Sequence, residues 1–337
     1  MSKPAHDIFE GKTILLTGGT GSFGSAFTRF VLKHHNPRAL RVFSRDELKQ
    51  YHLSREINDP RLRLFLGDVR DKDRLMRACT GVDIIVHAAA LKQVLACEYN
   101  PFEAIKTNIM GAVNIVDAAI DNGVKRVVAI TTDKAVNPVN LYGATKLCSD
   151  KVFIHGNSYS GPKSVAFSCV RYGNVLGSRG SVLPLFLKQK TSNTLEITDF
   201  EMTRFWISLQ DAVAFVISSI RTMVGGEIFV PKIPSLKIVD LARAVAPEAT
   251  LKEIGVRPGE KLHEVLITEQ ESRHTLNRPG EYIVLPEWFP SEKKRPYSGS
   301  ELDSGFSYTS NGNSQWLSSK QIHSMIKDFM GDSSHPF

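Results

Sequence analysis

Lys12-Thr13-Ile14-Leu15-Leu16-Thr17 is a short apolar run, and Gly18-Gly19-Thr20-Gly21-Ser22-Phe23-Gly24 follows it directly. A helical pattern then continues through Leu32. Glycines at 18, 21 and 24 permit a tight turn, a close approach of the backbone to a pyrophosphate, and close packing of helix on strand. A glycine-rich loop alone could be an ordinary turn, but the strand before it and the helix after it favour a dinucleotide site. The loop residues expected at the cofactor are Gly18, Thr20, Gly21, Ser22, Phe23 and Gly24.

The second predicted strand, residues 39–43, ends in a group of charged and hydroxyl side chains. An acid at this place usually meets a free ribose 2′-hydroxyl, whereas an arginine and a hydroxyl meet a 2′-phosphate. Ser44, Arg45 and Lys49 supply the second environment, so we predict NADP rather than NAD. Asp46 is also expected at the cofactor and suits the first turn of the next helix. The alternative is that Arg45 merely faces solvent.

Two further strands are predicted at 61–66 and 83–87, before a long helix at 101–122. His87 ends the second of them, and a lone histidine at a strand end is more often structural than catalytic. Asn108 is unfavourable inside a helix, so we expect it to bond to the neighbouring strand end. The chain is therefore predicted to be a Rossmann-like α/β protein with a doubly wound parallel sheet. The other residues expected at the cofactor are Asp68, Val69, Ala88, Ala90, Lys92 and Thr107.

Groups able to move protons follow the apolar run 126–130, which reads as a buried parallel strand. Asp133 and Lys134 come first, where open α/β sheets place their chemistry. Tyr142 and Lys146 come next, four residues apart and so on one helix face. A lysine beside a phenol lowers the pKa of the phenol and can hold the nicotinamide ribose. The alternative for Asp133 and Lys134 is a surface ion pair.

With these motifs in place, the chain resembles the extended short-chain dehydrogenases/reductases that modify nucleotide sugars. Retaining sugar-nucleotide 4,6-dehydratases have Asp-Glu where this chain has Asp133-Lys134. That lysine, with the stretches 44–49 and 90–94, resembles the inverting UDP-N-acetylglucosamine 4,6-dehydratases, which also epimerise C5, and most of all the branch that begins pseudaminic acid biosynthesis. The resemblance covers nearly the whole chain. Leu95 departs from it, because the family often has proline there.

The resemblance implies a mechanism. Hydride leaves C4 of the sugar for NADP, the new ketone acidifies the C5 proton, water leaves from C6, and the hydride returns to C6. Lys134 would be the C5 base, which requires a depressed pKa, and Asp133 the acid at C6. Tyr142 would be the base for C4 oxidation and a donor to C5, while Lys146 would tune Tyr142 and bind the cofactor ribose.

The second half is expected to hold the nucleotide sugar. Arg204 suits a diphosphate, although it could instead pair with Glu201 at (i, i+3). By resemblance, Arg257 contacts the UDP diphosphate and Glu260 the ribose. We expect residues 1–175 to form the NADP domain, to which some later elements return, and 176–337 to form mainly a cap and a C-terminal arm. The residues expected at the substrate are Lys92, Asn174, Val175, Ser181, Thr198, Arg204, Arg257 and Glu260.

Composition limits the classes of function. Of the 337 residues, 42% are hydrophobic and 23% charged, which is typical of a soluble globular protein. No signal-peptide core or membrane-spanning run is evident, so we expect a cytoplasmic protein without membrane partners. Scattered cysteines predict free thiols and no metal site. The net charge of +7 is dispersed, which argues against nucleic acid.

Three alternatives remain at this level: a UDP-sugar 4-epimerase, a retaining dehydratase, and a non-catalytic NADP-binding regulator. The first would need no Asp133-Lys134 pair, and Lys134 disfavours the second. Intact Tyr142 and Lys146 argue against the third. The resembling family forms dimers and hexamers, so a homo-oligomer is expected.

Overall fold

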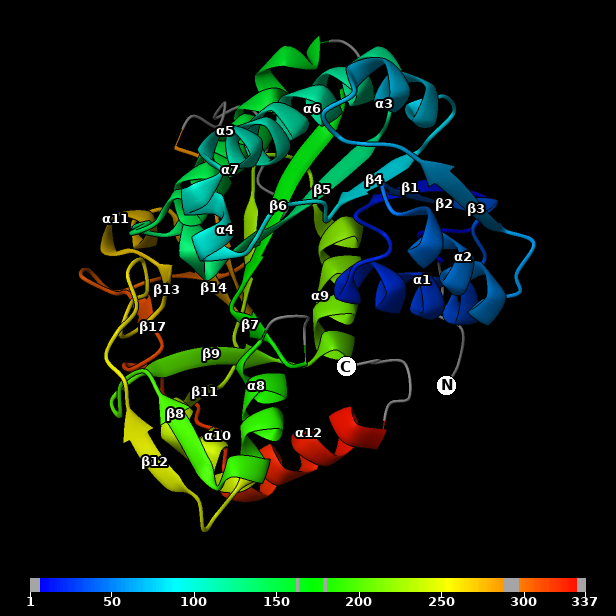
Figure 1. The fold of residues 1–337 in the computed structure, drawn as a ribbon. Coiled ribbons are helices and arrows are strands. Elements are labelled where there is room, and N and C mark those ends of the chain that lie inside the picture. The colour runs from blue at the N-terminus through cyan, green and yellow to red at the C-terminus, as the bar shows by residue number, and fades with distance from the viewer. Residues whose placement is uncertain (1–6, 162–163, 178–180, 288–296, 332–337) are drawn as a thin grey trace.

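The computed structural model describes residues 7–161, 164–177, 181–287 and 297–331. A large sheet with helices on both faces forms the upper part of the molecule in Figure 1, and a smaller lobe lies below it. The sheet order is β16-β14-β15-β10-β6-β5-β4-β1-β2-β3. The strands from β10 to β3 in this order are parallel, and the last three at the other end are antiparallel.

Apart from the edge strand β3, which is largely exposed, the parallel strands are short, largely buried apolar runs, as a sheet covered on both faces requires. Their bounds are β1 (Thr13–Thr17), β2 (Ala39–Ser44), β3 (Leu62–Leu66), β4 (Ile84–His87), β5 (Arg126–Thr132), β6 (Ala166–Tyr172) and β10 (Ile228–Pro231). The antiparallel strands are β14 (Thr275–Arg278), β15 (Glu281–Val284) and β16 (Ser300–Glu301). The predicted Rossmann-like fold is confirmed.

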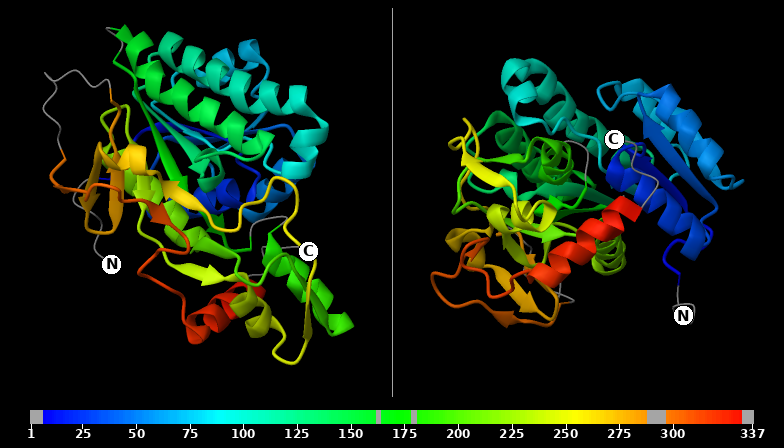
Figure 2. Two further views of the ribbon diagram at one scale, coloured as in Figure 1. Left: turned by 90° about the vertical axis from the view of Figure 1, so that its left-hand side faces the viewer. Right: turned by 60° about the horizontal axis from the view of Figure 1, so that its bottom comes forward.

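Helices cover both faces of the sheet (Figures 1 and 2). On one face, α1 (Ser22–His34) packs beside α9 (Leu209–Thr222). On the other face, α3 (Lys72–Cys79), α6 (Gly111–Asp121) and α7 (Leu141–Tyr159) lie side by side. The other helices of this part are α2 (Glu47–Glu56), α4 (Val94–Tyr99), α5 (Pro101–Ala104) and α11 (Glu269–Ser272). No helix within the described ranges is long and apolar enough to cross a membrane.

The smaller lobe has a hydrophobic core of its own. It contains the sheet β11-β9-β7, the pair β12-β8 and the helices α8 (Val182–Gln189), α10 (Ile238–Val245) and α12 (Ser319–Gly331). Strand β9 joins the two cores, because Phe205 packs in the large core and its neighbour Trp206 in the small one. The strand bounds are β7 (Asn174–Val175), β8 (Thr194–Ile197), β9 (Thr203–Ile207), β11 (Ser235–Lys237) and β12 (Thr250–Glu253). A further pair, β13 (Val265–Ile267) and β17 (Tyr308–Thr309), borders it.

Two expectations about elements are corrected. The sequence pattern predicts a helix at 210–223 and a strand at 227–230, both in the cap, but the first is α9, which packs on the large sheet, and the second is β10, a strand of that sheet. The long helix at 101–122 is interrupted by a π-helix, η1 (Ile105–Met110). Asn108 lies in η1, and its side chain bonds to the backbone N–H and carbonyl of Leu91. Leu91 is in the loop after β4, so the predicted bond to the neighbouring strand end is found just beyond that end. The loop 178–180 and the arm segment 288–296 lie outside the described residues.

The turn after β1 depends on glycine for two separate reasons. Gly18 has φ +66°, and a Cβ built there would lie 2.8 Å from the backbone of Ala88. The backbones after β1 and β4 therefore meet without room for a side chain. Gly123, at the end of α6, has the same φ of +66° but nothing within 4 Å of a built Cβ.

These two glycines form a matched pair for mutation. Gly123→Ala should lower the free energy of unfolding by about 1–2 kcal/mol, the cost of a left-handed alanine. Gly18→Ala should cost about 1–3 kcal/mol more, because the methyl group also collides with Ala88. Urea unfolding of both variants measures the difference, and equal losses would contradict the close approach.

Candidate active site

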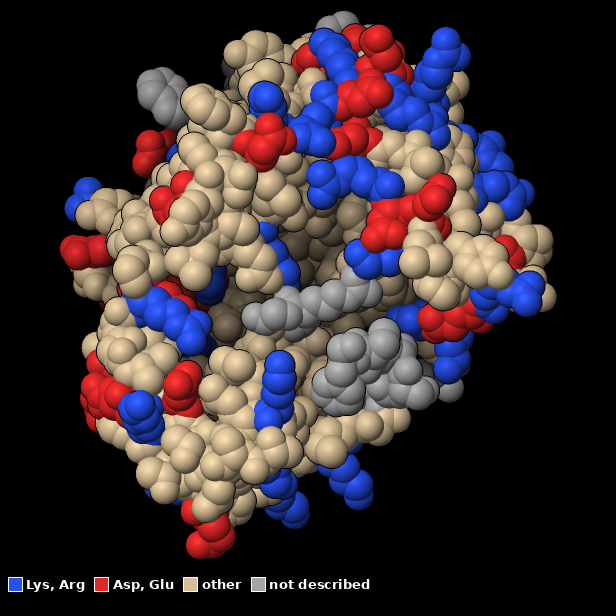
Figure 3. Space-filling view, in the orientation of Figure 1, with Lys and Arg blue, Asp and Glu red and all other residues tan. Residues whose placement is uncertain are grey.

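A cavity of about 890 Å³ opens between the carboxyl ends of the parallel strands and the smaller lobe. Figure 3 shows the molecule hollowed at this junction. The cavity brings together every residue predicted at the cofactor, although these come from six separate segments. They are Gly18, Thr20, Gly21, Ser22, Phe23, Gly24, Ser44, Arg45, Asp46, Lys49, Asp68, Val69, Ala88, Ala90, Lys92, Thr107, Tyr142 and Lys146.

The glycine loop has the chemistry of a phosphate cradle. Gly21 is the N-cap of α1, no side chain caps this helix in the described structure, and its first turn lines the cavity, where a helix N-terminus favours an anion. A Cβ at Gly24 would lie 2.5 Å from Gly19, which shows how closely helix and loop pack. Thr107 Oγ1 is buried without a hydrogen-bond partner among the described residues. These residues fit a dinucleotide.

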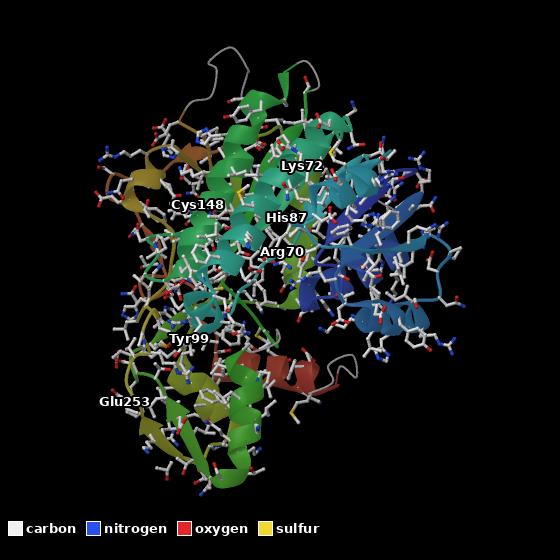
Figure 4. All side chains as sticks on the ribbon, turned by 45° about the horizontal axis from the view of Figure 1, so that its top comes forward. Arg70, Lys72, His87, Tyr99, Cys148 and Glu253 are labelled. Atoms are coloured by element: carbon white, nitrogen blue, oxygen red, sulfur yellow. The ribbon has the colours of Figure 1, made fainter. Side chains whose placement is uncertain are left out.

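Basic and acidic groups alternate at the far end of this cradle. Arg45 is 54% exposed and lies 3.7 Å from Asp68, which also accepts from Arg70 at 2.7 Å (Arg70 is labelled in Figure 4). Burial opposes the charge of Asp68, but the hydrogen bonds from Arg70 and the charges of Arg70 and Arg45 together outweigh burial and lower the pKa of that carboxyl. Asp46 caps α2 as predicted, accepting from the Lys49 N–H at 2.9 Å. Its carboxylate therefore serves the helix.

The start of α7 fixes the predicted Tyr-x-x-x-Lys pair. Asn140 caps the helix by accepting from the Gly143 N–H at 2.7 Å. A Cβ at Gly143 would overlap the carbonyl of Lys134, so glycine lets α7 touch the short 3₁₀ turn η2 (Asp133–Ala135). Lys146 Nζ donates to the carbonyl of Ile130 at 2.9 Å. Tyr142 and Lys146 thus both face the end of β5.

The pKa of Tyr142 reflects its burial and its neighbours at the end of β5. Burial raises the pKa of Tyr142 to about 12, while the Lys134 ammonium and a hydrogen bond with Thr132 oppose that rise. The Lys134 ammonium therefore favours the phenolate. Burial lowers the pKa of Lys146, and the charge of Asp150, one turn further along α7, partly offsets that effect.

Asp133 and Lys134 form an internal pair rather than a surface ion pair. The Asp133 side chain is 0% exposed and that of Lys134 27% exposed, with Nζ 2.9 Å from Oδ1. Asp133 Oδ1 also accepts from Thr132 Oγ1 at 2.9 Å. Asp133 Oδ2 is buried and has no hydrogen-bond partner in the described part of the chain. This second oxygen can therefore accept a hydrogen bond from another partner.

The electrostatics correct one prediction and support another. Burial raises the pKa of Asp133 against the attraction of Lys134, as an acid requires. Burial also disfavours the Lys134 ammonium, but the carboxylates of Asp133 and Glu264 outweigh it and raise the pKa of this lysine. The expected depression of the Lys134 pKa is therefore wrong for this structure, because a second carboxylate faces the amine.

Glu264 is that second carboxylate, and sequence reasoning missed it. Its side chain is 3% exposed, with Oε1 3.3 Å from Lys134 Nζ and 3.6 Å from Arg204 Nε. Lys261 Nζ lies 3.9 Å from its other oxygen. The resemblance points instead to Glu260, in the same loop, as the acid at the substrate. A carboxylate leading directly into the short apolar strand β13 was the available signal.

The residues predicted at the substrate divide into two groups. Lys92, Asn174, Val175 and Ser181 line the cavity, and Asn174 Oδ1 lies 3.4 Å from Lys134 Nζ. Thr198, Arg204, Arg257 and Glu260 are outside the described lining, in or beside the smaller lobe. Arg257 and Glu260 are 3.9 Å apart.

The alternative pairing of Arg204 with Glu201 is wrong. Arg204 faces Glu264, and Glu201 pairs with Lys237 at 3.2 Å. The reason is that Arg204 lies in strand β9, so an (i, i+3) neighbour is not on its face.

The sequence matches the polysaccharide biosynthesis protein family over residues 14–286. It is also 50% identical to a UDP-N-acetylglucosamine 4,6-dehydratase (inverting) from Campylobacter jejuni, over 96% of this chain and all of the relative. The chain belongs to the polysaccharide biosynthesis protein family. A relative from Rickettsia conorii is named UDP-glucose 4-epimerase.

Solved structures agree with this placement in the family. Pen from Bacillus thuringiensis has a TM-score of 0.88 at 36% identity, covering 96% of this chain and 99% of that one. The dTDP-glucose 4,6-dehydratase DesIV from Streptomyces venezuelae, solved with NAD bound, has a TM-score of 0.66 at 25% identity, covering 74% and 86%.

His87 has the structural position expected of it. It is 1% exposed within the large domain (Figure 4), and its Nδ1 lies 2.8 Å from Thr17 Oγ1. Burial, assisted by the charge of Lys146, lowers the pKa of His87 to about 3. Between about pH 3 and pH 6.5 the histidine is therefore neutral in the folded protein, whereas the unfolded chain would protonate it.

This depressed pKa makes stability depend on pH in a defined direction. Below about pH 6.5 the unfolded chain binds a proton that the folded protein refuses until about pH 3, so the His87 contribution falls as pH falls. Between pH 5.5 and 4.5 it should fall by about 1.4 kcal/mol. His87→Asn should remove this dependence, and the exposed control His34→Asn should not. Urea unfolding at both pH values tests it; identical slopes for wild type and His87→Asn would contradict it.

Proposed function

We propose that this protein removes water from UDP-N-acetylglucosamine with inversion at C5, with NADP as cofactor. The product would be UDP-2-acetamido-2,6-dideoxy-β-L-arabino-hex-4-ulose. The observation that carries the proposal is the pair of buried Asp133 and half-buried Lys134 beside Tyr142, at the cavity of about 890 Å³ that the glycine loop also lines. The inverting dehydratase that is 50% identical supports the same reaction.

The cofactor would lie along the glycine loop. When bound, NADP supplies the hydride acceptor for C4 and the hydride donor for C6. The N-terminus of α1 would hold its pyrophosphate, and Lys146 the nicotinamide ribose. Arg45, which is half exposed beside Asp68, would bind the 2′-phosphate, because a guanidinium binds phosphate oxygens in a bidentate manner.

Oxidation at C4 begins with Tyr142. Its phenolate takes the proton of the C4 hydroxyl as the hydride leaves. Burial opposes that phenolate, but the Lys134 ammonium and the Thr132 hydroxyl stabilise it. Substrate contact with Asn174 and Lys92, which line the same cavity, would orient the sugar.

Elimination uses the Asp133–Lys134 pair. One proton passes from the Lys134 ammonium to the Asp133 carboxylate, across the 2.9 Å hydrogen bond. This single transfer produces a neutral amine and a carboxylic acid, the base and the acid that the reaction requires. The amine takes the C5 proton, and the acid protonates the C6 oxygen, which leaves as water. Lys134 is then again an ammonium and Asp133 a carboxylate.

The cycle closes when Tyr142 protonates C5 from the opposite face. The proton that left the C4 hydroxyl becomes the new C5 proton, and Tyr142 is again a phenolate. The old C5 proton remains on Lys134 and leaves with water in the next turnover. All three side chains return to their starting states, so no external acid or base is needed.

The reaction can be tested by NMR of the product formed in deuterated water. The proposal expects deuterium at C5, the L-arabino configuration and loss of the C6 hydroxyl. A 4-epimer that keeps its water would favour the 4-epimerase instead, which needs Tyr142 but not the Asp133–Lys134 pair. A retained C5 configuration would favour the retaining dehydratase.

Several broader features belong to the same proposal. The smaller lobe, within 176–337, would hold UDP through Arg204, Arg257 and Glu260. Exposed apolar side chains on α4 and α5, with Tyr99 84% and Phe102 75% exposed, support self-association into a homo-oligomer. The product would enter pseudaminic acid synthesis in the cytoplasm, for modification of flagellin or surface polysaccharide.

Lys134→Ala separates cofactor binding from chemistry. NADP affinity should stay near that of wild type, because the side chain lies at the sugar end of the cavity. Release of the 4-keto sugar should fall by about 10²–10⁴-fold, the usual contribution of a general base. Fluorescence titration and product assay measure the two effects, with Lys237→Ala, an exposed lysine paired to Glu201, as control. Full turnover by Lys134→Ala would exclude the assignment.

Arg45→Ala tests the choice of cofactor. The preference for NADP over NAD should fall by about tenfold or more, since a hydrogen bond to a charged group contributes about 1.5–3 kcal/mol. The matched control is Arg55→Ala, an exposed arginine at the other end of α2. Titration of each variant with both cofactors measures the ratio, and an unchanged ratio would refute a 2′-phosphate contact.

A further inference from the structure

Glu264 is held rigidly at the catalytic cluster by its own backbone. Its N–H donates to Ser310 Oγ at 2.9 Å, and its carbonyl accepts from the Ser310 N–H at 2.8 Å. Ser310 Oγ also lies 2.6 Å from Thr203 Oγ1, at the start of β9. Strands β13 and β17 pair beside this contact. A segment near the C-terminus therefore sets the position of a carboxylate facing Lys134.

Charged groups surround this carboxylate on several sides. Lys134 and Asp133 face it from η2, Arg204 from β9 and Lys261 from its own loop. The neighbouring titratable group is His263, whose Nδ1 bonds with Thr203 Oγ1 at 2.8 Å. Glu264 Oε2 is buried and has no hydrogen-bond partner in the described chain. A purely structural role, in which Glu264 neutralises Arg204 and Lys261, would explain two of the contacts.

The contact with Lys134 goes beyond that role. Lys134 Nζ lies between two carboxylates, 2.9 Å from Asp133 and 3.3 Å from Glu264. Either carboxylate could in principle accept its proton. Burial raises the pKa of Asp133, whereas Lys134, Arg204 and Lys261 overcome the same burial and lower the pKa of Glu264. The cations therefore leave Asp133 as the better proton acceptor.

We propose that Glu264 is a positioning residue for the elimination step, which holds Lys134 Nζ beside Asp133 and directs the lysine proton to Asp133. The inference rests on the proposed function. In that step an N–H bond of Lys134 breaks and an O–H bond of Asp133 forms, while Glu264 keeps its charge throughout. Glu264 itself exchanges no proton with the sugar.

The pH profile of kcat distinguishes this role from a merely structural one. The pair is active when Asp133 and Lys134 together hold one proton. The acidic limb and the basic limb of the bell-shaped pH profile therefore both report the titration of this pair. Glu264→Gln removes a negative charge, which makes both protons easier to lose. Both limbs should move to lower pH, by about 1–3 units for a charge at this range. Glu264→Asp keeps the charge, so it should keep the limbs while lowering kcat through the misplaced Lys134.

Lys261→Met provides the opposite test. It removes a positive charge from the same cluster, so both limbs should move to higher pH. Glu201→Gln, an exposed carboxylate paired with Lys237, should leave the profile unchanged. A second readout follows reduced nicotinamide in single turnover. Oxidation at C4 precedes the Lys134 step, so Glu264→Gln should accumulate reduced cofactor that wild type does not.

The outcomes separate the two proposals. If wild type forms no 4-keto product from UDP-N-acetylglucosamine, the proposed function fails. If wild type is active and the limbs of Glu264→Gln coincide with those of wild type, the role of Glu264 is overturned and the function stands. If Glu264→Gln does not melt cooperatively or bind NADP, Lys261→Met decides, and an unshifted profile overturns the inference.

Discussion

The contact between η2 and the start of α7 is the constraint on which the site depends. The carbonyl of Lys134 occupies the place where a side chain at 143 would be, so the two segments meet backbone to backbone. This contact brings the phenol of Tyr142 and the Asp133–Lys134 pair to the same end of β5. Asn140 reinforces it, because its side chain caps α7 and also donates to the carbonyl of Gly259. The loop that delivers Glu264 is thereby tied to the same point.

Burial then gives similar groups different properties. Two carboxylates, Asp133 and Glu264, lie in one water-poor cluster, yet their proton affinities are displaced in opposite directions. The difference comes from how many cations face each one. Burial of an ion pair costs desolvation free energy, so such a cluster is weak evidence for stability. Its value here is chemical, because it makes an acid and a base from adjacent residues.

Local patterns were enough to predict the parallel sheet and much of the cavity lining, because many lining residues lie in the glycine loop or directly after an apolar strand, and Tyr142 and Lys146 form a recognisable spaced pair on α7. Glu264 could not be found in this way. It lies 130 residues from Lys134, and long-range contacts such as the bond from Asn140 to the Gly259 carbonyl and the pairing of β13 with β17 place it at the site. The error over the Lys134 pKa has the same cause, since the sequence around it shows one carboxylate. The sequence also did not show that β10 joins the large sheet and that α9 packs on it, because chain order does not say which sheet a strand joins.

Strand β9 has a mechanical consequence. Successive side chains of a strand point to opposite faces, so Phe205 and Trp206 are anchored in different cores although they are neighbours in the chain. A displacement of one core therefore strains the backbone that serves the other, so the two lobes are mechanically coupled at this strand.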